Sequence, residues 1–436
     1  MGRRLYSTTL YALMPLIWRR VWREALPERS RRERLGHIPA YDGERVLWVH
    51  AASVGEVTTA RSLIRSLIDD YPEHRVVVTT MTATGARQLQ ALFADLVTHH
   101  FLPLDFPGAV RRFIARLQPE LGLIVDTELW PNLIHAASDA GAPLAVVNGR
   151  ITPKAFRRYR RFDALMREPL RRLAWVGAKS GEDAKRFRTL GVEARNLTVT
   201  GALKFDLEVE ETVRGAAEAL RTSWGERPVW IAASTHEGEE QAVLEAHRRV
   251  LHQHPEALLI LVPRHPQRFD TVHELCLSSN MTTVRRSHHE SVGPQTRVYL
   301  ADTMGELMLL YGCADAAFVG GSWLPDVGGH NLLEPAALGV PVLSGGCLES
   351  LREIAEALTV DHARLEVADG SALARALLAL FDDPSARERL GAAAHSIVET
   401  HRGALALTRR HVARLVEARR LAHLAAEEEV DASSRT

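Results

Sequence analysis

Short apolar runs alternate with helical periodicities through almost the whole chain, and this alternation restricts the fold more than any other feature. Continuous runs of this kind are typical of strands covered by helices on both faces. In the first half the predicted strands are 46–49, 75–79, 97–101, 121–125, 144–147, 173–177 and 197–200, separated by helices such as 58–71, 83–93 and 109–117. In the second half they are 229–232, 258–262, 297–300, 315–319 and 341–343. The sequence therefore predicts an α/β protein with doubly wound parallel sheets.

With 436 residues, the chain is too long for one ordinary hydrophobic core, so two domains are expected. The strand pattern pauses at the polar, acidic stretch "TGALKFDLEVEETV", which begins at Thr200. We therefore predict two Rossmann-like domains facing a central cleft. The predicted divisions are an amino-terminal segment at 1–40, domains at 41–206 and 207–425, and a frayed polar tail at 426–436.

Charge and cysteine content narrow the class of protein. The 54 basic residues balance the 54 acidic ones, so no global field attracts nucleic acid, and none is expected as a partner. Cys276, Cys313 and Cys347 are far apart and show no CxxC spacing. This argues against a disulfide framework or a thiolate zinc site and suits a cytosolic protein.

The first 20 residues combine an apolar stretch at 5–18 with arginines on both sides. About 20 apolar residues are needed to span a bilayer, and this stretch is shorter and contains polar residues and a proline. Trp18 and Trp22 at its end are typical of a segment that lies at a membrane interface. The alternative is a helix packed on the protein's own surface.

Acidic side chains follow two strands of the first half, where open α/β sheets bind ligands. In "VLWVHAASVGEV" (46–57), a buried strand is followed by a stretch of small residues that leads to Glu56. In "DTELWPN", Asp126 and Glu128 follow a central strand. One of these carboxylates could instead cap a helix, and an Asp-x-Glu pair could hold a divalent metal. No histidine or third acid has a convincing spacing for a metal site. Lys204, near the predicted domain junction, could face an anionic leaving group.

In the second half, "FVGGSWLPDVGGHNLLEPAALGVPVL" (318–343) is the most informative segment. Its glycines allow backbone N–H groups to approach a phosphate at a helix amino terminus. Glu334, one turn into that helix, is placed to accept hydrogen bonds from ribose hydroxyls. A purely local capping box between Asn331 and Glu334 is the alternative. Two further strand-to-helix turns place Arg264 between prolines and Gly305 before Glu306, which together favour a nucleotide site over isolated surface features.

Taken together, these stretches resemble the family of 3-deoxy-D-manno-octulosonic acid (Kdo) transferases, from about residue 31 to residue 403. The motifs shared in order are "HAASVGE", "TTMTATGA", "DTELWPN", "NGRIT", "TGALKFD", "STHEGEE", "VPRHPQRF", "DTMGELMLLYG" and "VGGHNLLEPAALG". The resemblance implies a GT-B fold and an inverting, metal-independent transfer of Kdo from CMP-Kdo to a lipid A precursor (lipid IVA) in lipopolysaccharide core synthesis. No cofactor is implied, because CMP-Kdo is the donor substrate. The implied location is the cytoplasmic face of the bacterial inner membrane, with an amino-terminal anchor.

The resemblance also implies roles for individual residues. Glu56 corresponds to the general base, and Asp126 and Lys204 to residues that support the transition state. The implied donor contacts are Pro263, Arg264, Met304, Gly305, Glu306, Asn331, Leu332, Leu333 and Glu334.

The chain departs from the family pattern at three places. Asp126 stands where the family usually has glutamate, "GHNLLE" lacks the proline of the family's "GHNPLE", and "NGRIT" replaces the commoner "NARLS". The first departure leaves the role of Asp126 uncertain, because its side chain is one methylene shorter.

The sequence leaves four other classes of protein as alternatives. Nucleotide-sugar epimerases share the architecture but need no lipid-facing segment, and other GT-B enzymes use nucleotide sugars. A dinucleotide-dependent dehydrogenase is disfavoured because no G-x-G-x-x-G follows the first strand. A non-catalytic nucleotide-binding protein is the last alternative.

Overall fold

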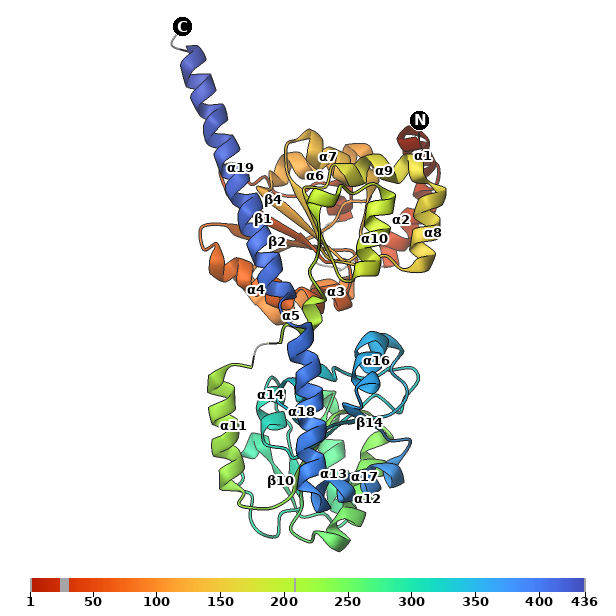
Figure 1. The fold of residues 1–436 in the computed structure, drawn as a ribbon, viewed down its shortest axis with the longest axis vertical. Coiled ribbons are helices and arrows are strands. Elements are labelled where there is room, and N and C mark those ends of the chain that lie inside the picture. The colour runs from red at the N-terminus through yellow and green to blue at the C-terminus, as the bar shows by residue number, and fades with distance from the viewer. Residues whose placement is uncertain (1, 24–30, 208, 435–436) are drawn as a thin grey trace. The chain divides into compact units, whose positions relative to one another are not determined.

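The computed structural model describes residues 2–23, 31–207 and 209–434. The chain forms two compact units (Figure 1). The first unit contains Met1–Asp206 together with Arg402–Thr436, and the second contains Leu207–His401.

Seven parallel strands form the sheet of the first unit, in the order β3-β2-β1-β4-β5-β6-β7. The strands are β1 (Val46–His50), β2 (Arg75–Thr80), β3 (Thr98–Phe101), β4 (Leu121–Val125), β5 (Leu144–Gly149), β6 (Trp175–Ala178) and β7 (Leu197–Val199). The winding direction reverses between β1 and β4, so these two neighbours form the topological switch point of the sheet.

Helices cover both faces of this sheet. One face packs against α6 (Pro107–Leu117), α7 (Pro131–Asp139), α9 (Asp163–Arg171) and α10 (Gly181–Leu190). The other face packs against α3 (Val54–Thr59), α4 (Arg61–Asp70), α5 (Ala83–Phe93) and α19 (Ala404–Ser434). Trp48 joins the first core, whereas Leu47 and Val49 join the second. Each such side chain contributes roughly 1.5–3 kcal/mol when fully buried, which explains why β1 is apolar without interruption.

Two amino-terminal helices belong to the first unit. They are α1 (Gly2–Ala12), which packs against α7 and α9, and α2 (Met14–Arg23). No helix in the described parts of the chain is long and apolar enough to cross a membrane. The contacts of α1 with α7 and α9 place this helix on the protein's own surface, which is the alternative considered above. Whether the segment also contacts a membrane stays a prediction.

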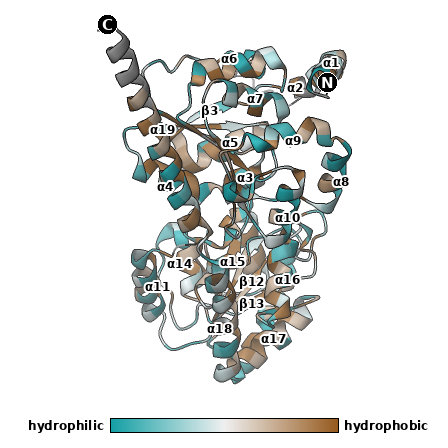
Figure 2. Ribbon diagram, turned by 45° about the horizontal axis from the view of Figure 1, so that its top comes forward, coloured by the Kyte–Doolittle hydropathy of each residue, from teal (hydrophilic) through white to brown (hydrophobic). Residues whose placement is uncertain are grey.

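The second unit repeats the architecture with a parallel sheet in the order β10-β11-β9-β8-β12-β13-β14. Its strands are β8 (Val229–Thr235), β9 (Leu258–Pro263), β10 (Thr283–Arg285), β11 (Val298–Leu300), β12 (Ala316–Val319), β13 (Val342–Ser344) and β14 (Arg364–Glu366). Its helices are α11 (Glu211–Ser223), α12 (Glu239–Gln253), α13 (Phe269–Ser278), α14 (Leu307–Gly312), α15 (Leu333–Ala337), α16 (Arg352–Val360), α17 (Gly370–Asp382) and α18 (Pro384–His401). Helices α12, α13, α17 and α18 line one core and α11 and α14 the other, around the apolar strands seen in Figure 2.

The predicted fold class of two Rossmann-like, doubly wound units is confirmed. Strands β10 and β14 escaped prediction because they are three-residue edge strands without a fully buried face. The single helix predicted at 58–71 is wrong. The chain instead forms α3 and α4, which meet at Ala60, and α3 already begins at Val54.

The division of the chain differs from the predicted one at its carboxyl end. Residues from Arg402 onward return to the first unit, whereas the prediction placed 207–425 in one domain. The Asp206 carboxylate accepts hydrogen bonds from Gly403 N at 2.7 Å and Leu405 N at 2.8 Å, which caps the start of α19. Helix α19 continues to Ser434, through residues predicted as a frayed tail, because alanine and glutamate there are strong helix formers.

Candidate functional site

The predicted site residues lie at or after the carboxyl ends of strands, and those that follow β1, β4 and β12 adjoin the switch point of their sheet. In the first unit, Glu56 follows β1 and Asp126 follows β4, the two strands between which the winding reverses. In the second unit the reversal lies between β8 and β12. Ligands of open α/β sheets bind at such points, so the topology groups residues that are far apart in sequence.

Glu56 lies in the first turn of α3, whereas the sequence predicted that the helix would begin only at residue 58. Ser53 is the N-cap, and Glu56 completes a capping box in which its Oε2 accepts from Ser53 N at 3.1 Å. Burial, reinforced by the nearby charges of Glu128 and Asp126, raises the pKa of Glu56 to about 7. A carboxylate poised near neutral pH is suited to accept a proton.

The loop of "TTMTATGA" supports this turn from the side. Met81 N donates to Ala52 O at 2.8 Å, and α5 packs against α3. A Cβ atom at Gly85 would lie 2.9 Å from Thr82 Oγ1 and 3.4 Å from the carbonyl carbon of Ser53. Glycine at position 85 therefore leaves room for the Thr82 side chain, which caps α5.

Asp126 is held by a side chain that joins three motifs. Asn148 of "NGRIT" donates from Nδ2 to Asp126 Oδ1 at 2.5 Å and accepts from Leu203 N at 3.1 Å through Oδ1. Leu203 begins the short helix η4 (Leu203–Phe205), which contains Lys204. Asp126 and Asn148 both have left-handed backbones, with φ of 59° and 55°, a conformation that these residue types tolerate.

Positive and negative charges meet around Asp126. Burial raises the pKa of Asp126, while the hydrogen bond from Asn148 and the charges of Lys179, Lys204 and Arg150 oppose that rise. Lys204 is exposed, and its charge lowers the pKa of Asp126; its role in the transfer stays a prediction. Within the described residues, no group of three His, Cys, Asp or Glu side chains is arranged to hold a metal ion. Metal independence remains a prediction.

Glu128 faces a buried histidine. Its Oε2 accepts from Trp130 Nε1 at 2.9 Å and lies 4.0 Å from His50 Nε2. His50 Nδ1 lies 3.1 Å from Thr79 O, which can only accept, so we assign the ring proton to Nδ1. Burial lowers the pKa of His50 to about 4, so the ring is neutral and directs an Nε2 lone pair toward Glu128.

In the second unit, one buried glutamate ties the loop after β8 to the loop after β12. Glu239 accepts from Gly321 N at 2.7 Å, His236 N at 3.1 Å and Trp323 N at 3.3 Å. After β9, Pro263 is buried and Arg264 is exposed, with its own N–H bonded to Thr235 O at 2.9 Å. These contacts fix the backbone that presents the Arg264 side chain.

Three histidines from three motifs gather on these loops. His236 Nε2 lies 2.8 Å from His330 Nε2, the two rings stack, and His265 packs edge-on against His236. Burial, together with the charges of His236, Arg264 and His265, lowers the pKa of His330 to about 4. Burial also lowers the pKa of His236, so this stacked pair is neutral beside the arginine.

The remaining predicted donor contacts differ in what they can offer. Asn331 does not act as the N-cap of α15. Its Oδ1 accepts from Leu333 N at 3.1 Å and its Nδ2 donates to Glu334 at 3.1 Å, while Leu332 occupies the N-cap position. Leu332 and Leu333 are fully buried, so their side chains pack inside the second unit.

The turn at 304–306 can offer a ligand its backbone groups, but the Glu306 carboxylate is already paired within the protein. Met304 is 63% exposed, and Gly305 has a φ of +87° that glycine adopts readily. Glu306 forms an ion pair with Arg286 at 2.7 Å, and this arginine holds the pKa of Glu306 below its usual value. Its charge is therefore already compensated within the protein.

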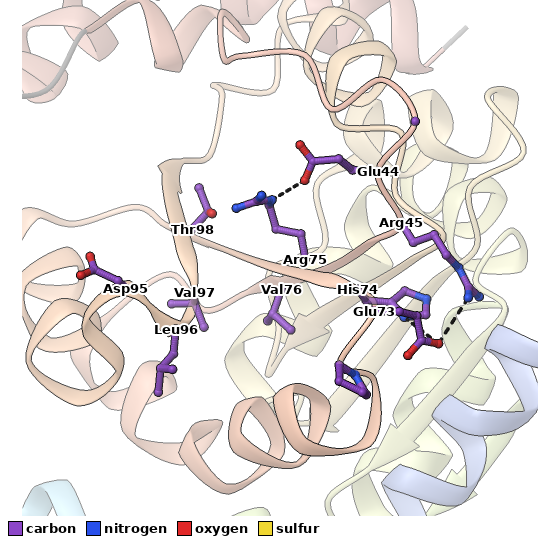
Figure 3. Close-up of a pocket in the computed structure, with 12 residues that line it drawn as sticks. Glu44, Arg45, Glu73, His74, Arg75, Val76, Asp95, Leu96, Val97 and Thr98 are labelled. Atoms are coloured by element: carbon purple, nitrogen blue, oxygen red, sulfur yellow. Dashed lines mark hydrogen bonds and ion pairs between the residues drawn. The ribbon is translucent and has the colours of Figure 1, made fainter.

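A pocket of about 550 Å³ lies at the amino ends of β1, β2 and β3 in the first sheet (Figure 3). Its charged residues pair with one another: Arg75 bonds Glu44, and Arg45 bonds Glu73. The predicted site residues of the first unit lie instead at the carboxyl ends of the strands.

Several residues of the site were missed from the sequence. Asn148, His50, His236 and His330 all belong to the quoted motifs, but nothing in a linear spacing shows which motifs touch. The capping signature Ser-x-x-Glu at 53–56 was the one local signal available, and it would have placed Glu56 on a helix.

Comparisons with known proteins agree with the motifs. Residues 29–207 match the family described as 3-deoxy-D-manno-octulosonic-acid transferase (kdotransferase), and residues 228–396 match glycosyl transferases group 1. The 3-deoxy-D-manno-octulosonic acid transferase of Haemophilus influenzae is 40% identical over 413 residues, which cover 93% of this chain and 96% of that protein.

Two solved structures are also similar. The C-terminal CMP-Kdo binding domain of WaaA from Acinetobacter baumannii is 39% identical, covering 43% of this chain and 99% of that one, with a TM-score of 0.42. UDP-GlcNAc 2-epimerase from Neisseria meningitidis is 13% identical with a TM-score of 0.52, covering 85% of this chain and 100% of that one. The epimerase likeness shows the GT-B type of fold alone. By sequence, the chain belongs to the 3-deoxy-D-manno-octulosonic acid transferase family and is a glycosyltransferase.

Proposed function

We propose that this protein transfers Kdo from CMP-Kdo to a lipid A precursor, lipid IVA, in lipopolysaccharide core synthesis. The observation that supports this most directly is Glu56, a half-buried carboxylate at the first switch point whose pKa is raised to about 7. Membership of the family supplies the donor and acceptor class, and the geometry supplies a base for the acceptor.

The proposed transfer is a single displacement at the anomeric carbon of Kdo. An acceptor hydroxyl oxygen attacks the anomeric carbon of Kdo while Glu56 takes the hydroxyl proton. The bond between that carbon and the CMP phosphate oxygen breaks, and its electron pair leaves with CMP. Because attack and departure occur on opposite faces, the configuration at the anomeric carbon inverts. Asp126 and Lys204 support the developing charges on the acceptor side and the leaving-group side.

The donor is proposed to bind to the second unit. Arg264 offers an exposed guanidinium to the phosphate, and Glu334, positioned by Asn331, offers a carboxylate to the ribose hydroxyls. Backbone groups of the turns at 304–306 and 331–334 complete the nucleotide contacts. Pro263 orients the loop that holds Arg264.

The acceptor is a lipid, and the outer face of α1 and α2 is proposed to contact the membrane at the cytoplasmic side. The exposed fractions of the side chains are 69% for Leu5, 44% for Leu13 and 68% for Leu16. Exposing these apolar side chains to water is unfavourable, and contact with a lipid surface would remove that cost. Replacing Leu5 and Leu16 with serine should release the protein from anionic vesicles. Unchanged co-sedimentation of that variant would place the membrane contact elsewhere, with the basic helix α8 (Pro153–Arg161) as the next surface to test.

Product analysis tests the function. Purified protein, CMP-Kdo and a tetraacylated lipid A precursor should yield Kdo-lipid by mass spectrometry, with CMP released only when donor and acceptor are both present. CMP or an altered sugar formed without acceptor would instead support a hydrolase or the epimerase alternative.

A further inference from the structure

Helix α1 has an inner face that the membrane contact does not use. Its partly buried residues recur at positions 3, 6, 7 and 10, whereas Arg4, Leu5, Thr8 and Thr9 are exposed. This spacing is that of one helix face, and here the inner face is polar as well as apolar. Polar side chains on a docked face need partners, and α1 finds them at one place.

That place is the last residue of the "DTELWPN" motif. Arg3 Nε donates to Asn132 Oδ1 at 3.1 Å, and Asn132 Nδ2 donates to Ser7 Oγ at 3.2 Å. Asn132 is 1% exposed, and its Nδ2 also donates to Asp105 O at 2.7 Å. The amide of this motif residue is therefore satisfied partly by α1.

Asp105 provides a second connection. Its carboxylate accepts from Asn132 N at 3.0 Å and Leu133 N at 2.8 Å, two N–H groups of the first turn of α7 that have no partner within the helix. The Tyr6 side chain approaches the same carboxylate, and its hydroxyl lowers the pKa of Asp105. Tyr11 stacks on the adjacent Phe106 with ring centroids 4.9 Å apart. Helix α1 thus holds the residue that caps α7.

The amino end of α7 leads directly to the acids of the site. Trp130 is the N-cap residue of α7, and its indole N–H donates to Glu128 at 2.9 Å. Glu128 in turn contributes to the raised pKa of Glu56. A displacement of the first turn of α7 would therefore move a group that acts on the proposed base.

We propose that the inner face of α1 positions the loop at 126–130, which carries Asp126 and Glu128. In this arrangement Arg3, Tyr6 and Ser7 hold Asn132 and Asp105. These two residues orient the first turn of α7 and, through Trp130, also Glu128. This inference rests on the proposed function, and it assigns α1 a role in turnover that is separate from any contact with lipid. Arg3, Tyr6 and Ser7 are positioning residues, since none of them touches the reacting groups.

Two substitutions test it, each in the full-length protein with acceptor in detergent micelles, where membrane attachment has no effect. Arg3→Met removes the hydrogen bond to Asn132, and Tyr6→Phe removes the hydroxyl beside Asp105. Each should lower kcat about 5- to 30-fold, the effect of losing one such bond, without changing the KM for CMP-Kdo. Arg4→Met is the matched control, because it removes the same charge from the exposed face of the same helix, and it should retain wild-type kcat. Arg3→Lys restores a donor and should recover most of the activity.

Amide hydrogen exchange gives a second readout. Asn132 and Leu133 should exchange faster in Arg3→Met and Tyr6→Phe than in Arg4→Met. Faster exchange with wild-type kcat would show that the contact is only structural, and unchanged exchange would show that α1 does not hold the loop; either result overturns the proposal. If the wild-type protein forms no product, the proposed function fails by itself, and exchange still decides whether α1 orders the loop.

Discussion

The two units share one architecture but place opposite chemistry at their switch points. In the first, β1 and β4 lead to Glu56, Asp126 and Glu128, three half-buried acids whose pKa values are raised by burial. In the second, the corresponding loops carry the exposed Arg264 together with His236 and His330, whose pKa values are lowered by burial. The first arrangement suits removal of a proton, and the second suits an anionic nucleotide. The same pattern of strands and helices therefore specifies where ligands bind but not what is done to them.

Removing the proposed base should have the largest effect. Glu56→Gln keeps the capping box, because glutamine also serves at that position, but removes the proton acceptor. Turnover should fall roughly 10²- to 10⁴-fold with CMP affinity unchanged. Glu182→Gln is the control, since Glu182 also lies in a first helical turn of the first unit. Near wild-type turnover in Glu56→Gln would leave Glu56 a purely structural cap and direct the search to Asp126 and Glu128.

The donor site should respond in binding rather than in proton transfer. Arg264→Ala and Glu334→Ala should each weaken CMP binding by about 1–3 kcal/mol, or roughly 5- to 150-fold in Kd. Arg248→Ala changes an arginine that pairs with Glu245 on α12 and should leave Kd unchanged. Calorimetry would refute the assignment of the nucleotide to the second unit if both site variants bound CMP normally.

The pH dependence sharpens the contrast between the two units. The base must be deprotonated, so kcat/KM should rise with pH through the pKa of Glu56, which is about 7. The charge of Glu128 raises that pKa, so Glu128→Gln should move the acidic limb to lower pH. If the acidic limb of the pH profile did not move, Glu128 would not act on the titrating group. The affinity for CMP alone should not show this dependence on pH.

The smallest predicted effect concerns a departure from the family pattern. Gly149 occupies the position of alanine in "NARLS", and a Cβ atom there would lie 3.0 Å from Phe187 Cε2 and 3.2 Å from Gly177 O. Gly149→Ala should therefore lower the free energy of unfolding by about 1–3 kcal/mol, as overpacking does. Gly181→Ala, where nothing lies within 4 Å, is the control. Equal chemical denaturation midpoints would mean that Phe187 moves aside without cost.

The strands and the class of fold were predictable because a strand buried on both faces must be apolar at every position. Val46–Val49 shows this directly, and each buried strand of both sheets showed the same signal. The motifs likewise identified the acids and the glycine-rich turns, since Glu56, Arg264 and Glu334 are recognisable from local sequence and from the family resemblance.

Other features depended on contacts between distant parts of the chain. The return of α19 to the first unit depends on Val412 and Val416 packing under the sheet and on Asp206 capping the helix. The joining of three motifs by Asn148 and the docking of α1 on Asn132 are likewise long-range hydrogen bonds. By itself, the sequence determined the elements and the residues able to do chemistry, because burial and residue type act locally. Tertiary structure alone decided which of them meet, because strand order and helix docking are set by packing across the whole unit.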